Sequence, residues 1–188
     1  MKKEIRIGTY LYPMPVTIVG ANVEGKPNFM PIAWCSIVEH SPPMIEISAS
    51  KNHYTNKGIK ENGTFSINIP SIDMIEITDY IGIKSGKDID KSELFEIFYG
   101  ELKTSPMISQ APLNLECKLE HIVNLEIQHE IFIGEIIKAY AEEEIIENNI
   151  PDIKKLNPVI FSMNDNNYWE LGKHIGRAWS IGRDFKTD

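Results

Sequence analysis

Residues 28–55 read NFMPIAWCSIVEHSPPMIEISASKNHYT, and the fold class follows from this stretch. Asn28 to Val38 is a run of apolar and small residues that ends before the turn Ser41-Pro-Pro43. Met44 to Ala49 then alternates apolar and polar side chains, which is typical of a half-buried strand. With the earlier run Val16 to Val19, these segments make short strands at roughly ten-residue spacing, which predicts an antiparallel sandwich or barrel rather than a βαβ array.

Short helices are expected between further strands. Residues 54–61 have a helical signal, which Asn52 or Thr55 could cap at its start and Asn62-Gly63 would end. Residues 73–81 have apolar side chains at helical spacing. Strand patterns recur at residues 64–69, 113–125, 130–142 and 159–163. The chain is therefore expected to be mainly β with a few short helices, and to form one domain over residues 1–188.

The composition is that of a globular protein, since 42% of its 188 residues are hydrophobic and 24% are charged. A formal net charge of −8 and a pI near 5.2 argue against binding to nucleic acid or to an anionic membrane, because both attract a basic face.

Cys35 and Cys117 do not form a CxxC pair, so no zinc or other metal site is expected. Residues 1–8 lack the apolar core of a signal peptide, which predicts a cytoplasmic location.

The end of the Met44 to Ala49 strand carries a candidate anion site. Here the chain passes from a strand end directly into a helix start, where unpaired N–H groups and a partial positive charge favour an anion. Hydrogen-bond donors and one charge come from Ser48, Ser50, Lys51, His53 and Thr55. A phosphate on a small ligand would fit there without a basic protein surface. The alternative is that the Ser and Thr side chains only cap the helix.

Three further features have a functional and a purely structural interpretation. Trp34 and Cys35 could present an aromatic edge and a soft surface to a flat ring, or Trp34 could belong to the core. The stretch 79–91 contains glycines that would let backbone amides approach a ligand, or it is a solvated loop. His129, at the head of an apolar strand, could donate to an anionic ring or be an ordinary strand-end histidine.

Sequence motifs for protein-based catalysis are absent. The sequence contains no HExxH, P-loop, GxSxG or GxGxxG pattern, and its five histidines share no metal-ligand spacing. Such patterns are the usual signs of metal, phosphate or nucleophile chemistry. If the chain is an enzyme, we therefore expect a cofactor to carry the chemistry.

Ordered sequence segments along most of the chain indicate a family. They are Gly25-Lys-Pro-Asn-Phe-Met-Pro-Ile-Ala-Trp34, Ser41-Pro-Pro43, Ile47-Ser-Ala-Ser50, His53-Tyr-Thr55, Phe65-Ser-Ile-Asn-Ile-Pro70, Asp79-Tyr-Ile-Gly-Ile-Lys-Ser-Gly-Lys-Asp-Ile-Asp-Lys91, Asn114-Leu-Glu-Cys117, His129-Glu-Ile-Phe-Ile-Gly134 and Tyr168-Trp-Glu-Leu-Gly172. In order and spacing they resemble the flavin reductase-like, FMN-binding split-barrel proteins, and within them the flavoredoxin branch. The resemblance implies a split β-barrel of antiparallel Greek-key strands.

The same resemblance implies which residues hold FMN. The isoalloxazine would lie along Ala33, Trp34, Cys35 and Ser36, with Ser48, Ala49 and Ser50 beneath the flavin and its ribityl chain. The phosphate would be held by His53, Tyr54 and Thr55. A loop carrying Ser85, Gly86 and Lys91 would close over the flavin. Many family members have arginine in place of His53, which predicts a weaker or pH-dependent charge at the phosphate in this chain.

The resemblance also implies a function. NAD(P)H would donate hydride to FMN, and electrons would pass on to an acceptor. His129 matches a histidine near the flavin face, although Gln128 before it departs from the family pattern. The alternatives are a flavin-binding electron carrier without NAD(P)H turnover, or the same barrel with another ligand such as haem or pyridoxal phosphate. We also expect a homodimer, because a small split barrel leaves sheet surface uncovered, with Trp169 and Trp179 either at that interface or on their own barrel.

Overall fold

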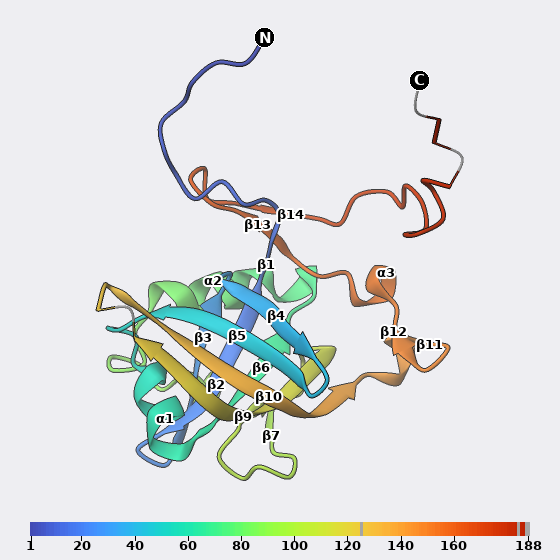
Figure 1. Cartoon of the computed structure of the whole chain (residues 1–188). Coiled ribbons are helices and arrows are strands. Elements are labelled where there is room, and N and C mark those ends of the chain that lie inside the picture. Colours follow the sequence, from blue (N-terminus) through green and yellow to red (C-terminus); the bar gives the residue numbers. More distant parts are fainter. Residues whose placement is uncertain (125, 184, 187–188) are drawn as a thin grey trace.

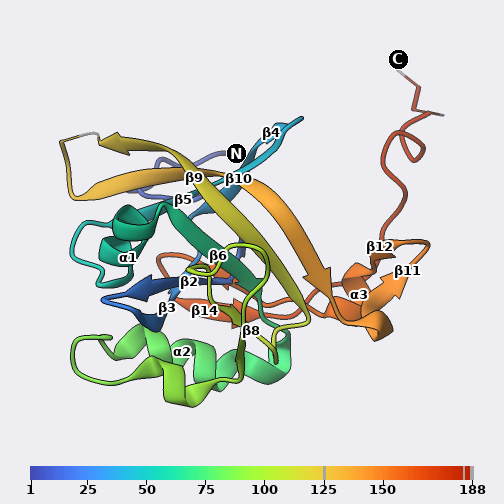
Figure 2. The same cartoon turned by 90° about the horizontal axis from the view of Figure 1, so that it is seen from below.

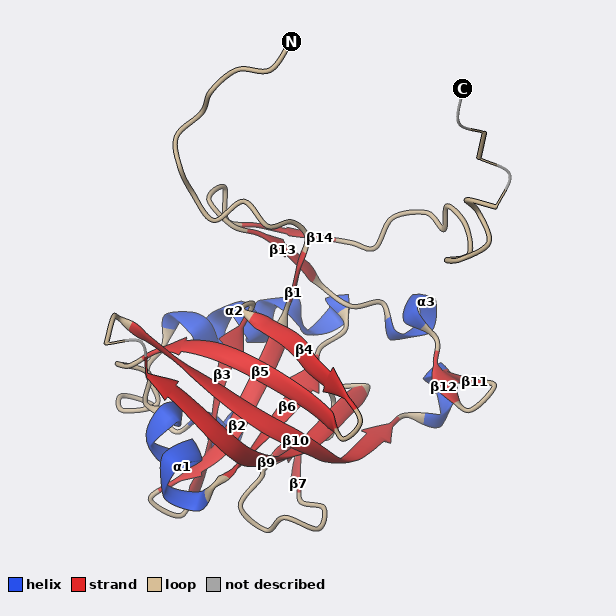
Figure 3. Cartoon of the chain, viewed as in Figure 1, coloured by secondary structure: helices blue, strands red, loops and turns tan. Residues whose placement is uncertain are grey.

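The computed structural model describes residues 1–124, 126–183 and 185–186. Within these residues, the main sheet has seven antiparallel strands in the order β3-β2-β6-β9-β10-β5-β4 (Figures 1 and 3). The strands are β2 (Thr17–Val23), β3 (Lys26–Ile32), β4 (Cys35–His40), β5 (Pro43–Ser50), β6 (Thr64–Ile69), β9 (Leu113–Asn124) and β10 (His129–Ala141). The prediction of a mainly β, antiparallel fold is confirmed.

The sheet is curled and split at one corner. β3 and β4 lie at opposite edges of the sheet, yet only Ala33 and Trp34 separate them in the sequence. Because two residues span only about 7 Å, the two edges must approach each other at this corner. The sequence had predicted one continuous run from Asn28 to Val38. That prediction was wrong: the chain leaves one edge at Ala33 and joins the other, where the Ser48 amide donates to the Trp34 carbonyl at 2.9 Å.

The inside of the curl holds the hydrophobic core. Val19, Ile47, Phe65 and Phe132 are fully buried there, and Ile59 of α1 (Thr55–Asn62) packs among them. Burial of each such side chain contributes about 1.5–3 kcal/mol to stability. The predicted alternation of β5 is confirmed, because its residues are alternately buried and half-buried along the strand.

The helix α1 begins without the cap that was predicted. Its N-cap is Tyr54, whose side chain makes no capping hydrogen bond. The Thr55 hydroxyl instead accepts a hydrogen bond from Asn28 Nδ2 of β3 at 2.7 Å. The predicted end of the helix is correct, since Gly63 has φ 65° and its amide donates to the Ile59 carbonyl. A glycine adopts this left-handed conformation without steric cost.

A helical layer covers the edge of the sheet beside β3. It consists of η1 (Ile72–Met74), α2 (Ile75–Ile83) and the short turn η2 (Lys91–Leu94). Figure 2 shows α2 running beside β3. A second apolar cluster joins this layer to the sheet through Phe29, Ile81 and Phe95. The helix therefore brings its C-terminal end, and the loop after it, next to β3.

Smaller elements complete the chain. They are β1 (Met14–Pro15), β7 (Ile97–Phe98), β8 (Met107–Ile108), η3 (Glu143–Ile145), β11 (Ile146–Glu147), β12 (Ile150–Pro151), α3 (Ile153–Leu156), β13 (Ile160–Ser162) and β14 (Asn167–Trp169). β1, β13 and β14 pair as a small sheet, from which both terminal segments extend away from the main sheet (Figure 1). Among the described residues, no helix has the length and apolar character needed to span a bilayer.

Candidate functional site

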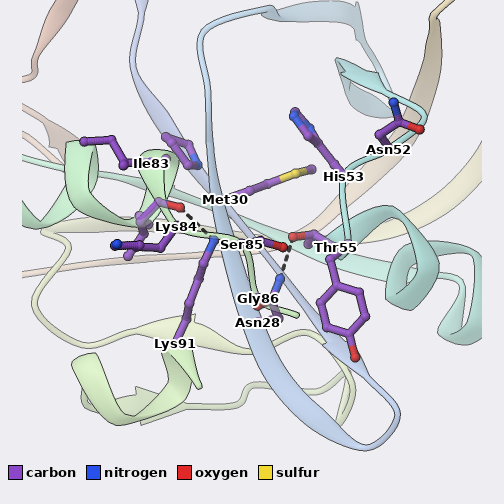
Figure 4. Close-up of a pocket in the computed structure, with 14 residues that line it drawn as sticks. Asn28, Met30, Asn52, His53, Thr55, Ile83, Lys84, Ser85, Gly86 and Lys91 are labelled. Carbon is purple, nitrogen blue, oxygen red and sulfur yellow. Dashed lines mark hydrogen bonds between the residues drawn. The ribbon is translucent and has the colours of Figure 1, made fainter. Parts of the chain in front are cut away.

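A pocket of about 290 Å³ opens where β3, the start of α1 and the end of α2 meet. We call it the α1 pocket (Figure 4). Its lining comprises Asn28, Met30, Pro31, Asn52, His53, Tyr54, Thr55, Ile81, Gly82, Ile83, Lys84, Ser85, Gly86 and Lys91. The pocket thus collects side chains from three separate parts of the sequence.

The turn between β5 and α1 supplies one side of this pocket. The Ser50 carbonyl accepts hydrogen bonds from the His53 amide at 3.0 Å and from Asn56 Nδ2 at 2.9 Å. Asn56 also donates to the buried Glu130 carboxylate at 3.1 Å. These bonds fix the turn, so that the first residues of α1 face the pocket. The positive end of the helix dipole therefore lies beside it.

Lys91 supplies a buried positive charge to the α1 pocket. The residue is only 4% exposed, and its ammonium donates to the carbonyls of Phe29 at 2.9 Å and Ile81 at 2.7 Å. Among the described residues, no carboxylate forms an ion pair with it. Burial lowers the pKa of Lys91 to about 8. A buried cation without a counter-ion is costly, so an anion in this pocket would compensate it.

The remaining polar groups of the pocket are held in place by the fold. Asn28 and Thr55 bond each other in the interior, as the dashed line in Figure 4 shows. Gly86 lies against Asn28 so closely that a Cβ would overlap its carboxamide. Burial lowers the pKa of His53, and the nearby charges of His129 and Lys91 lower it further. His53 is therefore mostly neutral at pH 7 in the ligand-free chain.

A second pocket of about 360 Å³ lies along the corner between β3 and β4. We call it the Trp34 pocket, and its lining is Thr9, Leu11, Pro13, Met14, Pro15, Ala33, Trp34, Cys35, Ser36, Glu46 and Ser48. The Trp34 ring packs on the His129 ring with a centroid distance of 4.9 Å and an interplanar angle of 32°. Its indole N–H points to the Met163 sulfur at 3.3 Å. This pocket is apolar and aromatic, unlike the α1 pocket.

The structure divides the predicted site residues between the two pockets. The α1 pocket contains His53, Tyr54, Thr55, Ser85, Gly86 and Lys91. The Trp34 pocket contains Ala33, Trp34, Cys35, Ser36 and Ser48. Ser50 lines neither pocket; it pairs with His129 across β5 and β10. The Ala49 side chain is packed in the core, so its backbone alone is available to a ligand.

Sequence reasoning missed Asn28, Met30, Pro31, Asn52 and Lys84 as pocket residues. Asn28 carried a usable signal, because it is a polar residue in an otherwise apolar strand and its burial requires a hydrogen-bond partner. Asn52 lies beside the predicted turn. The positions of Met30 and Lys84 depend on how α2 packs on β3, which no local pattern encodes.

The fold sets the surroundings of the two cysteines and of the possible metal ligands. Burial raises the pKa of the Cys35 thiol to about 12, so it stays protonated and is a weak nucleophile. Burial also raises the pKa of Cys117. Among the described residues, no group of three or more His, Cys, Asp or Glu is placed to hold a metal ion.

The fold and the two pockets define a split β-barrel with an anion-attracting pocket beside β3 and an apolar pocket at the corner where β3 ends. The chain belongs to the family described as flavin reductase like domain, whose model matches residues 9–162. Its structure is similar to that of flavoredoxin from Methanosarcina acetivorans, with 48% identity, a TM-score of 0.94 and coverage of 97% of this chain and 98% of that one.

Two further relatives extend the comparison. Flavoredoxin of Desulfovibrio vulgaris (Miyazaki F) is 36% identical with a TM-score of 0.89, and the match covers 97% of this chain and all of that one. An uncharacterized protein of Archaeoglobus fulgidus is 30% identical over 146 residues, which cover 77% of this chain and 81% of the relative. The sequence-based assignment to the flavin reductase-like family and its flavoredoxin branch is confirmed.

Proposed function

We propose that this chain binds FMN and acts as an FMN-dependent oxidoreductase of the flavin reductase/flavoredoxin type, passing electrons from NAD(P)H to an acceptor. The observation that carries the proposal is Lys91 of η2, a buried ammonium that lines the α1 pocket and that no carboxylate of the described residues pairs with. The family assignment and the two flavoredoxin structures support it.

The residues of the α1 pocket fit the phosphate of FMN. Lys91 would supply the charge, Thr55 and Ser85 the hydroxyl donors, and the start of α1 the positive end of its helix dipole. His53 would add a second charge once an anion raises its lowered pKa. A phosphate therefore finds donors on several sides without a basic protein surface.

The Trp34 pocket and the corner beside it fit a flat ring. Ala33 and Ser36 line this pocket together with Trp34, whose ring packs on His129. The chemistry that FMN supplies when bound is acceptance of a hydride and delivery of electrons. The chain's own part is to orient the ring, to exclude water with apolar walls, and to donate a proton or hydrogen bond through His129, the residue we propose as catalytic.

The second candidate function is an electron carrier without NAD(P)H turnover. One observation favours it: Trp34 stacks on His129 and its N–H points to Met163. The Trp34 ring therefore covers one face of the His129 ring. In a carrier, the same contact would shield the bound flavin from NAD(P)H.

The visible spectrum of the purified protein with added FMN tests flavin binding. A flavin spectrum retained after gel filtration supports the proposal, and a colourless protein contradicts it. A spectrum of haem or pyridoxal phosphate would favour the third interpretation of the barrel. Anaerobic stopped-flow mixing with NADH or NADPH then separates the two functions, because rapid bleaching of the flavin absorbance supports the reductase and its absence supports the carrier.

We also propose that the chain is a homodimer. The outer face of β4 exposes Ile37 and Val38, and the terminal segments expose Leu11 and Trp179, the last at 94%. A second copy of the chain is the partner that we propose covers these apolar side chains. A monomeric mass by light scattering at micromolar concentration would contradict this proposal.

A further inference from the structure

Another pocket, which we call the outer pocket, lies next to the α1 pocket and shares lining residues with it. This outer pocket has a volume of about 370 Å³ and lies between the β2–β3 turn and the loop before η2. The two pockets have four lining residues in common, namely Asn28, Tyr54, Gly86 and Lys91. Since these residues face both pockets, they form the partition between them.

The partition is tightly packed. A Cβ at Gly86 would overlap the Asn28 carboxamide and would come 3.0 Å from Tyr54 Cδ1. Asn28 is fixed from behind by its bond to Thr55 at 2.7 Å, and the Tyr54 hydroxyl donates to Glu24 Oε2 at 3.3 Å. Asn28 and Tyr54 are therefore each held by a hydrogen bond, and Gly86 lies against both without room for a methyl group.

We infer that Asn28, Tyr54 and Gly86 form an end wall that limits the site to one phosphate, so that the chain selects FMN over FAD. This inference rests on the proposed function. In FMN the phosphate is a terminal monoester, and its free oxygens can end at the wall. In FAD the same phosphate is joined by a bridging oxygen to the phosphate of adenosine monophosphate. That second phosphate would have to lie either beyond the wall or on the solvent side, away from Lys91.

The charge of the ligand's phosphate also favours FMN over FAD. A phosphomonoester carries about −1.5 to −2 at pH 7, whereas each phosphate of a pyrophosphate diester carries a single negative charge. The buried Lys91 has no carboxylate partner among the described residues. It therefore gains more from the monoester than from the diester.

Titrations of FMN, FAD and riboflavin against the full chain and its variants test the inference. In the unmodified chain we expect FMN to bind at least about tenfold more tightly than FAD, a difference of about 1.4 kcal/mol. Tyr54→Ala opens the wall into the outer pocket and is expected to tighten FAD binding, so that the preference for FMN shrinks several-fold. Tyr54→Phe keeps the ring and removes only the bond to Glu24, and is expected to retain the preference. Riboflavin, which lacks the phosphate, should not distinguish the variants.

The outcomes separate this inference from the proposed function. Equal affinity of the unmodified chain for FMN and FAD overturns the wall but leaves the flavin site standing. Failure to bind any flavin overturns the proposed function. An unchanged FMN-to-FAD ratio in Tyr54→Ala also overturns the wall. If circular dichroism shows that Tyr54→Ala is unfolded, Tyr54→Leu provides the same test with a smaller loss of packing.

Discussion

Replacing Lys91 by methionine tests the anion site most directly. Methionine fills nearly the same space, so the substitution removes the charge and the two hydrogen bonds to the Phe29 and Ile81 carbonyls while keeping most of the packing. The pKa of about 8, against an ordinary value of about 10.4, means that burial disfavours the charged form by about 3 kcal/mol. A bound phosphate can return energy of this order to the protein.

The expected loss of FMN affinity follows from that magnitude. Hydrogen bonds to charged groups contribute about 1.5–3 kcal/mol, which corresponds to a Kd about 10-fold to 150-fold higher in Lys91→Met. Riboflavin has no phosphate, so its Kd should stay within about twofold of the unmodified chain, below 0.5 kcal/mol. Lys103→Met is the matched control, because Lys103 is exposed and bonds only the nearby Gly100 carbonyl.

The pH dependence supplies an independent check on the same residue. In the ligand-free chain the Lys91 ammonium is protonated below pH 8 and loses its proton above it. A bound phosphate raises this pKa, so binding above pH 8 requires uptake of a proton, and FMN affinity should fall as the pH rises from 8 to 10. The fall should be absent in Lys91→Met. Fluorescence titration measures both effects, and equal losses for FMN and riboflavin would refute a phosphate role for Lys91.

Three other substitutions and one control give further predictions. The pKa of His53 is lowered in the free chain and rises beside a phosphate, so FMN affinity should increase as the pH falls from 7.5 to about 6, and His53→Ala should flatten that profile in fluorescence titrations. Gly86→Ala places a methyl group on the Asn28 carboxamide and should weaken FMN binding by about tenfold or more. Gly172→Ala, which meets no atom within 4 Å, should leave FMN binding unchanged. Phe132→Ala removes a fully buried ring and should lower the free energy of unfolding in urea by about 3–5 kcal/mol; a loss below about 1 kcal/mol would contradict its place in the core.

The main β content of the chain could be predicted because its signals are local. The alternation along β5 assigns Ile45 and Ile47 to one face whatever the rest of the sheet does, and Gly63 ends α1 because its conformation favours glycine. The start of α1 could not be predicted in the same way. Thr55 is the kind of residue that caps a helix, but a side chain from β3 uses its hydroxyl instead.

The sequence by itself determined the family, the mainly β strand pattern and eleven of the residues that line the two pockets, because residue type and spacing along the chain carry this information. Only the tertiary structure decided that Lys91 is buried with no carboxylate of the described residues paired to it, that Ala49 faces the core, and that the Trp34 ring packs on His129. Burial and the distance between residues far apart in sequence depend on how the sheet curls and where α2 packs. Those features are set by the sum of many weak contacts, which no single segment specifies.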